Sequence, residues 1–187
     1  MNDPVLIFDT GVLYDLVSSP TLSKAACEAW AGRTMWVPPS VRAEIHYRIK
    51  VRLKSLPPQL PGRAAGLLTS KLWKFEVLDL SQAETAEVVR LQAALGGRGN
   101  AGECEAAVIC ARRSPDALVL IDDTKSLPVL TSYVRRESGA SMWTQRWVEA
   151  ALDLRDGRFL TDDQVRSVVR ELRSNDRPYV DDAALPV

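Results

Sequence analysis

The chain has 187 residues, of which 46% are hydrophobic and 26% are charged. This composition excludes a disordered or fibrous protein and is typical of one ordinary globular domain. The 24 basic residues balance the 24 acidic ones, which excludes a global positive field for nucleic acid, so any basic patch must be local. We expect a single domain over residues 1–175, followed by a C-terminal tail over 176–187.

The cysteines and the apolar runs indicate a compartment. Cys27, Cys104 and Cys110 are odd in number and lack the spacing of a zinc or haem motif, which favours a reducing cytosol. The apolar run from Val5 to Phe8 is too short for a signal peptide, and no run reaches the roughly 18 to 20 residues that span a bilayer. We therefore expect a cytoplasmic protein that does not contact a membrane.

The N-terminal segment predicts a strand, two helices and a second strand. Residues 5–8 form a short apolar run that Asp9 closes, which is the pattern of a buried strand with a polar group at its carboxyl end. Helices are expected over 11–17 and 22–31. The second strand is expected over 35–37, because two prolines follow it.

A helix with one apolar face comes next. Ser40 is suited to cap this helix, and Val41, Ile45 and Ile49 recur along it at spacings of four residues. The segment 55–66 is rich in proline and glycine, so it is predicted to be a loop within the domain.

The middle of the chain predicts another strand and helix. A strand is expected over 75–80, and Ser81 with Glu84 matches a capping box that opens a helix to about Leu95. The glycines of 96–102 interrupt the helical pattern.

The C-terminal half is expected to be mostly helical. Helices are predicted over 103–113, over 125–136, over 141–153 and from Thr161 to about Arg173. One fully apolar strand, over 117–121, lies among them and ends in Asp122 and Asp123. In the helix over 141–153, Trp143 and Trp147 are one turn apart and are expected to fill a core or an interface rather than to stack on bases.

This alternation of short buried strands with helices predicts an α/β fold with a parallel sheet. In such folds the functional groups collect outside the carboxyl ends of the strands. Asp9 and the pair Asp122 and Asp123 both follow a buried strand at that end. A carboxylate there is partly removed from water and is costly unless a cation or hydrogen bonds compensate.

These acids predict a metal site. Tips of neighbouring parallel strands lie about 5 Å apart, and magnesium takes oxygen ligands while keeping several waters. Glu103 adds an acid in the first turn of a helix that follows a glycine-rich segment, where the helix dipole favours it. The alternative for each acid taken singly is a helix cap or a turn residue.

Four segments together resemble the acidic motifs of PIN domains: LIFDTGVL at 6–13, AE at 43–44, GECEAAVICA at 102–111 and VLIDDTKSL at 119–127. The resemblance implies a small central parallel sheet flanked by helices, an α/β/α sandwich. It implies a Mg²⁺- or Mn²⁺-dependent ribonuclease whose catalytic acids are Asp9, Glu44, Glu103 and Asp123, with the metal held by Asp9, Glu103, Asp122 and Asp123.

Two of these assignments have alternatives. The family pattern favours Asp123 over Asp122 as the main ligand, with Asp122 as its neighbour. Glu44 lies on an amphipathic helix between Arg42 and Arg48, where it is equally well a surface ion-pair partner.

The expected reaction is attack of a metal-activated water on a phosphodiester bond. His46 is the only histidine, so no Ser/His/Asp or Cys/His nucleophile set can be built convincingly. His46 itself is expected to be structural, with a contact to RNA as the alternative. Thr10 and Thr124 each follow an acid at a strand end and are expected to hydrogen-bond a ligand carboxylate or the phosphate; turn residues are the alternative.

The densest basic stretch is expected to contact the RNA phosphates through Arg42, Arg48, Lys50 and Arg52. A solvated helix face is the alternative interpretation. The C-terminal helices resemble a PIN subgroup found in bacterial toxin–antitoxin pairs, which implies a small antitoxin partner and a homodimer. The rival function is a catalytically silent PIN-like module that binds RNA or a protein.

Overall fold

The computed structural model describes residues 4–51, 56–97 and 100–175. Its centre is a five-stranded sheet with the order β3-β2-β1-β4-β5, in which all neighbouring strands are parallel. The strands are β1 (Leu6–Phe8), β2 (Met35–Val37), β3 (Glu76–Val77), β4 (Leu118–Leu120) and β5 (Trp143–Gln145). The predicted α/β fold with a parallel sheet is therefore confirmed, and all the carboxyl ends of the strands lie along one edge.

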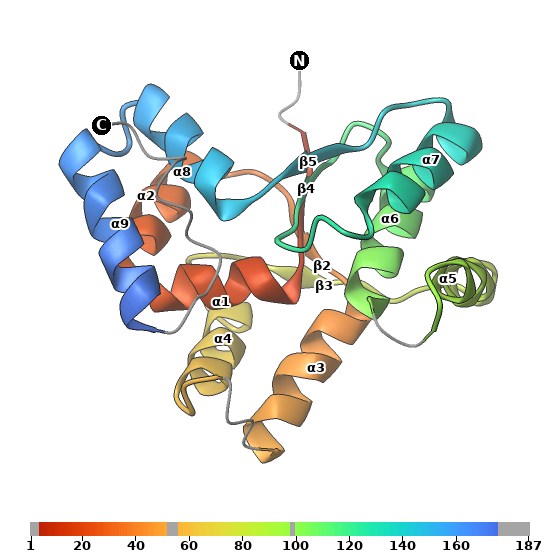
Figure 1. Ribbon diagram of the computed structural model, residues 1–187, viewed down its shortest axis with the longest axis horizontal. Helices are drawn as coiled ribbons and strands as arrows, with labels where there is room; N and C mark the ends of the chain where they lie inside the picture. Colours follow the sequence, from red (N-terminus) through yellow and green to blue (C-terminus); the bar gives the residue numbers. More distant parts are fainter. Residues whose placement is uncertain (1–3, 52–55, 98–99, 176–187) are drawn as a thin grey trace.

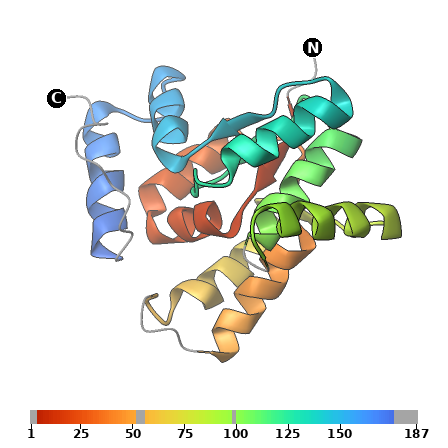
Figure 2. The ribbon, with the colours of Figure 1, turned by 45° about the vertical axis from the view of Figure 1, so that its right-hand side comes forward.

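Helices cover both faces of the sheet (Figure 1). One group consists of α1 (Thr10–Ser18), α2 (Pro20–Ala29), α8 (Trp147–Asp156) and α9 (Asp162–Ser174). The group on the other side consists of α5 (Gln82–Ala94), α6 (Ala101–Arg113) and α7 (Leu127–Ser138). The remaining pair, α3 (Pro39–Lys50) and α4 (Leu60–Leu68), projects from the body near the ends of β1 and β2, and α5 lies across α6 (Figure 2). The arrangement is the expected α/β/α sandwich.

The short strands are apolar throughout because both of their faces are covered. Phe8 and Leu120 point into the core formed with α1, α2, α8 and α9, whereas Ile7, Val119 and Ile121 belong to the core formed with α5, α6 and α7. All of these side chains are fully buried. Successive strand residues thus alternate between two cores, which explains the continuous hydrophobic runs.

The loop predicted over 55–66 is wrong in its second half. Helix α4 begins at Leu60, with Pro61 in its first turn and with Leu60 and Ala64 buried. Proline is tolerated there because the first turn has no intrahelical acceptor for its missing N–H. The prolines therefore start a helix here and do not merely break one.

The helix predicted over 141–153 is wrong in its first part and is confirmed from Trp147 on. Residues Trp143–Gln145 form the edge strand β5, which pairs with β4, and α8 begins only at Trp147. Trp143 is 64% exposed whereas Trp147 is 3% exposed, so the two rings do not form the pair expected on one helix. A strand of three residues is too short to reveal its alternation in the sequence.

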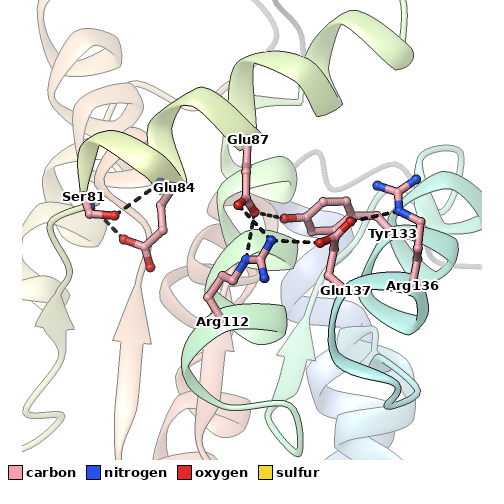
Figure 3. Close-up of polar contacts among 7 residues, drawn as sticks. All are labelled: Ser81, Glu84, Glu87, Arg112, Tyr133, Arg136 and Glu137. Atoms are coloured by element: carbon pink, nitrogen blue, oxygen red, sulfur yellow. Dashed lines mark hydrogen bonds and ion pairs between the residues drawn. The ribbon is translucent and has the colours of Figure 1, made fainter.

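A polar network ties α5, α6 and α7 together (Figure 3). The Arg112 guanidinium donates to both oxygens of Glu87 at 3.0 and 2.8 Å and to Glu137 at 2.8 Å, and the Tyr133 hydroxyl donates to Glu87. The capping box predicted at the start of α5 is confirmed: Glu84 N donates to Ser81 Oγ at 3.2 Å, and Ser81 N donates to Glu84 Oε2 at 2.8 Å. A hollow of about 700 Å³ lies beside this network, between α5, α6 and α7.

Two predicted segments lie outside the described residues: the tail over 176–187 and the basic residue Arg52. Within the described part, no helix combines the length and the hydropathy needed to cross a membrane.

Candidate functional site

Asp9 stands where β1 passes into α1. It is the N-cap of that helix, and its Oδ2 accepts a hydrogen bond of 3.3 Å from Gly11 N. Burial raises the pKa of Asp9 to about 6; the backbone N–H groups of Thr10 and Gly11 act against this, and the charges of Glu44 and Asp122 add to it. Asp9 is therefore both the helix cap and a carboxyl group whose charge is costly at this position.

Asp122 and Asp123 follow the neighbouring strand. Asp122 is half-buried and lies against Gly11, so close that a Cβ atom at position 11 would be 2.9 Å from the Asp122 Cβ. Asp123 is exposed, and its Oδ1 accepts a hydrogen bond of 2.9 Å from Lys125 N. The charge of Asp122 raises the pKa of Asp9 and that of Asp123 raises the pKa of Glu103, so both lie within electrostatic range of another acid. The contacts do not separate the two candidates for the main ligand.

Glu103 is the most enclosed acid of the set. It lies in the first turn of α6 and is 6% exposed. Burial raises the pKa of Glu103 to about 7, with further contributions from the charges of Asp9, Asp123 and Glu44, while the Ser126 hydroxyl lowers it. Among the described residues, neither Glu103 Oε2 nor the Ser126 Oγ near it has a hydrogen-bond partner. An unpaired buried carboxylate oxygen is rare and costly, so this atom marks a place for a cation or a donor.

The backbone at the start of α6 brings Glu103 to the sheet. Asn100 precedes the helix in the left-handed conformation, with a φ of 64°. Gly102 then approaches the end of β1 so closely that a Cβ there would be 2.9 Å from Asp9 Oδ1 and 2.9 Å from Val41 Cγ2. Only glycine leaves room for this approach.

Glu44 reaches the same place from α3. The Thr10 hydroxyl donates to Glu44 Oε2 at 2.7 Å, and Arg48 forms an ion pair with Glu44 Oε1. The Arg48 guanidinium also lies over the Tyr14 ring, 5.9 Å from its centroid. Because Glu44 raises the pKa of both Asp9 and Glu103, it lies within the group of acids. Glu44 therefore lies among the candidate catalytic acids and also forms the ion pair of the alternative interpretation, so its contacts do not separate the two.

Ser40 does not cap α3 as predicted. Pro38 is the N-cap residue of that helix, and Ser40 N and Ser40 Oγ donate to Glu105 Oε2 at 2.8 and 2.7 Å. Burial of the Glu105 carboxyl raises its pKa, which the Ser40 bonds oppose. This contact joins the helix of Glu44 to the helix of Glu103.

The two predicted hydroxyl groups lie in different surroundings. Thr10 contacts an acid, as described, but Thr124 is exposed. The hydroxyl that affects Glu103 belongs to Ser126, which is 1% exposed and precedes α7. A serine before a Leu-Pro pair looks like an ordinary helix cap, so the sequence carried no signal for this position.

The predicted basic residues divide into two groups. Arg42 and Lys50 are exposed on α3, where they remain candidates for RNA contacts. Arg48 instead faces Glu44 and Tyr14, and His46 is exposed. The structure adds Arg146, whose pKa is raised by its bonds to Glu149 and also by the charge of Asp122. Sequence reasoning missed Arg146 because it placed the residue inside a helix.

The acids affect one another electrostatically, yet their side chains in the described residues are not arranged as a preformed metal site. Within residues 4–51, 56–97 and 100–175, no three His, Cys, Asp or Glu side chains have the spacing that would hold a metal ion. The chemistry of the set nevertheless fits a hard cation, because all its donors are carboxylate oxygens and one of them, Glu103 Oε2, is buried and unpaired. Asp9 and Glu103, with pKa values near 6 and 7, are also able to exchange protons near neutral pH.

No model of a protein family matches the sequence, and no curated protein matches it. The resemblance to PIN domains therefore stays a prediction from the four motifs.

Proposed function

We propose that the protein is a Mg²⁺- or Mn²⁺-dependent ribonuclease with a PIN-like domain, which hydrolyses phosphodiester bonds of RNA with a metal-activated water. The observation that carries the proposal is Glu103 Oε2, a buried carboxylate oxygen without a hydrogen-bond partner in the described residues. It lies in an acidic set drawn from β1, α3, α6 and the end of β4. Such a set is unfavourable without a cation.

Asp9 and Glu103 would hold the metal, together with one or both of Asp122 and Asp123. A bound ion of this kind polarises the scissile phosphate and lowers the pKa of a coordinated water. Thr10 fixes the orientation of the Glu44 carboxylate through its 2.7 Å hydrogen bond, which suits Glu44 to accept a proton from water or to position it. No covalent protein intermediate is required.

The rival function is a catalytically silent PIN-like module that binds RNA or a protein. What supports it is the spread of the acids, since no three of them in the described part have the spacing of a metal site. Under the nuclease proposal, a bound ion would relieve the repulsion among these carboxylates. Under the rival, they bind no divalent ion at any useful concentration.

A small antitoxin and a homodimer remain predictions of the motif resemblance. The antitoxin would cover the acidic set and block access of RNA. Copurification of a small protein from the native host supports the antitoxin. Light scattering that gives only a monomer at all concentrations contradicts the homodimer.

The test is cleavage of a mixed RNA substrate with Mg²⁺, with Mn²⁺ and with EDTA. Asp9→Asn and Glu103→Gln are each expected to lower the rate by at least about a hundredfold, because each removes a charged ligand. Asp163→Asn is the matched control, since Asp163 is 92% exposed on α9 and pairs only with Arg166 among the described residues. Metal-independent cleavage, or full activity of both variants, contradicts the proposal.

A further inference from the structure

An arginine, Arg146, lies in the same row of strand ends as the proposed metal ligands. The register pairs Phe8 with Leu120 and Leu120 with Gln145. Backbone hydrogen bonds continue this row, because Asp9 N donates to Leu120 O at 2.9 Å and Ile121 N donates to Gln145 O at 3.0 Å. Arg146 therefore follows β5 at the level where Asp9 follows β1. With neighbouring strands about 4.8 Å apart, their backbones are roughly 10 Å apart.

Glu149 orients the Arg146 guanidinium. Glu149 Oε1 accepts from Arg146 Nε at 2.9 Å and from Nη2 at 2.6 Å, and Glu149 Oε2 accepts from Arg146 N at 2.7 Å. The Arg146 side chain keeps 45% of its surface exposed. An arginine has further N–H donors beyond those that this carboxylate uses, so the guanidinium retains donors for a second anion.

The charges around Arg146 suit it to attract a phosphate. The charge of Asp122 adds to the raised pKa of Arg146, so the guanidinium lies within electrostatic range of that carboxylate. A set of carboxylates repels the RNA backbone, which a nuclease must nevertheless bring to them. Arg48, which pairs with one acid of the set, is occupied by Glu44 and Tyr14. Arg146 is the better placed of the two to meet an incoming phosphate.

We propose that Arg146, oriented by Glu149 at the carboxyl end of β5, binds an RNA phosphate next to the scissile one. This inference rests on the proposed ribonuclease function and adds a residue to it. A planar guanidinium recognises phosphate through two parallel N–H bonds. The contact positions the strand and does not read its bases.

The test measures binding of a labelled single-stranded RNA to the Asp9→Asn protein, which binds substrate without cutting it under the proposed function. Adding Arg146→Ala is expected to raise the Kd about tenfold and to reduce the slope of log Kd against log salt by about one phosphate contact. Arg146→Lys is expected to give an intermediate Kd, since lysine keeps the positive charge but lacks the two parallel N–H donors of the guanidinium. Thermal melting establishes that each variant is folded.

Arg166→Ala is the matched control. Arg166 is also paired with an acid three residues away, Asp163, but it lies on α9, and its removal is expected to leave the Kd unchanged. If Arg146→Ala and Arg146→Lys both bind RNA as the parent does, the inference is wrong while the ribonuclease proposal stands. If the parent protein binds no RNA at all, the ribonuclease proposal itself fails, and the inference with it.

Discussion

Gly102 and Asp9 approach each other so closely that a Cβ atom at position 102 would be 2.9 Å from the Asp9 carboxylate oxygen. The contact joins the start of α6 to the end of β1. It also places Glu103, the next residue, beside Asp9, and the negative charge of Asp9 raises the pKa of Glu103. The acidic set thus depends on the absence of a side chain at one position.

Gly102→Ala is predicted to harm both stability and activity. The added methyl group meets Asp9 Oδ1 and Val41 Cγ2, so the variant is expected to lose about 1 to 3 kcal/mol of unfolding free energy. Gly66→Ala is the control, because no atom lies within 4 Å of its added Cβ and the position is inside α4. That change is expected to stabilise by about 0.5 to 1 kcal/mol. Urea unfolding compares the two, and equal stabilities contradict the close approach.

Thr10→Val is predicted to lower RNA cleavage by about ten- to a hundredfold, because the Glu44 carboxylate loses the hydroxyl that orients it. Thr21→Val is a matched change elsewhere: the Thr21 hydroxyl donates to Glu171 Oε1 at 2.6 Å, where α9 meets α2. The control is expected to lose stability and to keep its cleavage rate per folded molecule. Loss of activity in both variants to the same extent contradicts a role for Thr10 in the site.

The stability of the metal-free protein is predicted to fall between about pH 5 and pH 8 because of Glu103. Its pKa is raised from 4.5 in the unfolded chain to about 7 in the folded one, so the folded state holds the proton longer. The stability from this carboxyl group is full below pH 4.5 and is lost as the pH rises through 7. Glu103→Gln is expected to gain on the order of 2 to 3 kcal/mol relative to wild type over this range.

The Glu84 carboxyl group contributes the opposite dependence of stability on pH, so Glu84→Gln is the control for the pH experiment. The pKa of Glu84 is lowered to about 2, chiefly by its hydrogen bond from Arg113. Its contribution is therefore present above the unfolded-state value of 4.5 and is lost as the pH falls toward 2. Urea unfolding of the three proteins from about pH 2 to pH 8 covers both trends. If the unfolding free energies of wild type and Glu103→Gln change with pH in parallel, the raised pKa of a buried Glu103 carboxyl group is falsified.

Arg113→Ala is predicted to destabilise the protein by about 2 to 4 kcal/mol at pH 7. Arg113 donates to both oxygens of Glu84 at 2.7 Å and to Asp79 O at 2.6 Å, and Glu84 is 8% exposed. Removing the arginine leaves a buried carboxylate without its partner. The exposed ion pair of Arg166 with Asp163 provides the comparison, with an expected change within about 0.5 kcal/mol. A small effect of Arg113→Ala, measured by urea unfolding, counts against the buried pair.

Most of the fold could be predicted from local patterns. The apolar runs that end at Asp9 and Asp122 are strands β1 and β4 because a strand covered on both faces is apolar throughout. Strand β5 was missed because its three residues are too few to show alternation and Trp143 is exposed. Helix α4 is not apparent from the sequence because prolines usually break helices, whereas here they lie before the helix and in its first turn.

The candidate site was predictable at its acids and not at its supporting residues. Asp9 and Glu103 follow from a strand end and from a helix start, which are local features of the sequence. The bonds from Ser40 to Glu105, the placement of Ser126 near Glu103 and the charge of Arg146 beside Asp122 arise only when distant elements pack together. Such contacts have no period or spacing in the sequence.

Binding of Mn²⁺ by the purified protein tests the central claim most directly, because it asks whether the acids hold a metal without requiring the correct RNA. Calorimetric titration at pH 8, where the pKa values of Asp9 and Glu103 leave both groups charged, is expected to show one saturable site in wild type and in Asp163→Asn. Glu103→Gln is expected to bind at least about tenfold more weakly. Wild-type protein that binds no Mn²⁺, or Glu103→Gln that binds it equally well, contradicts the account.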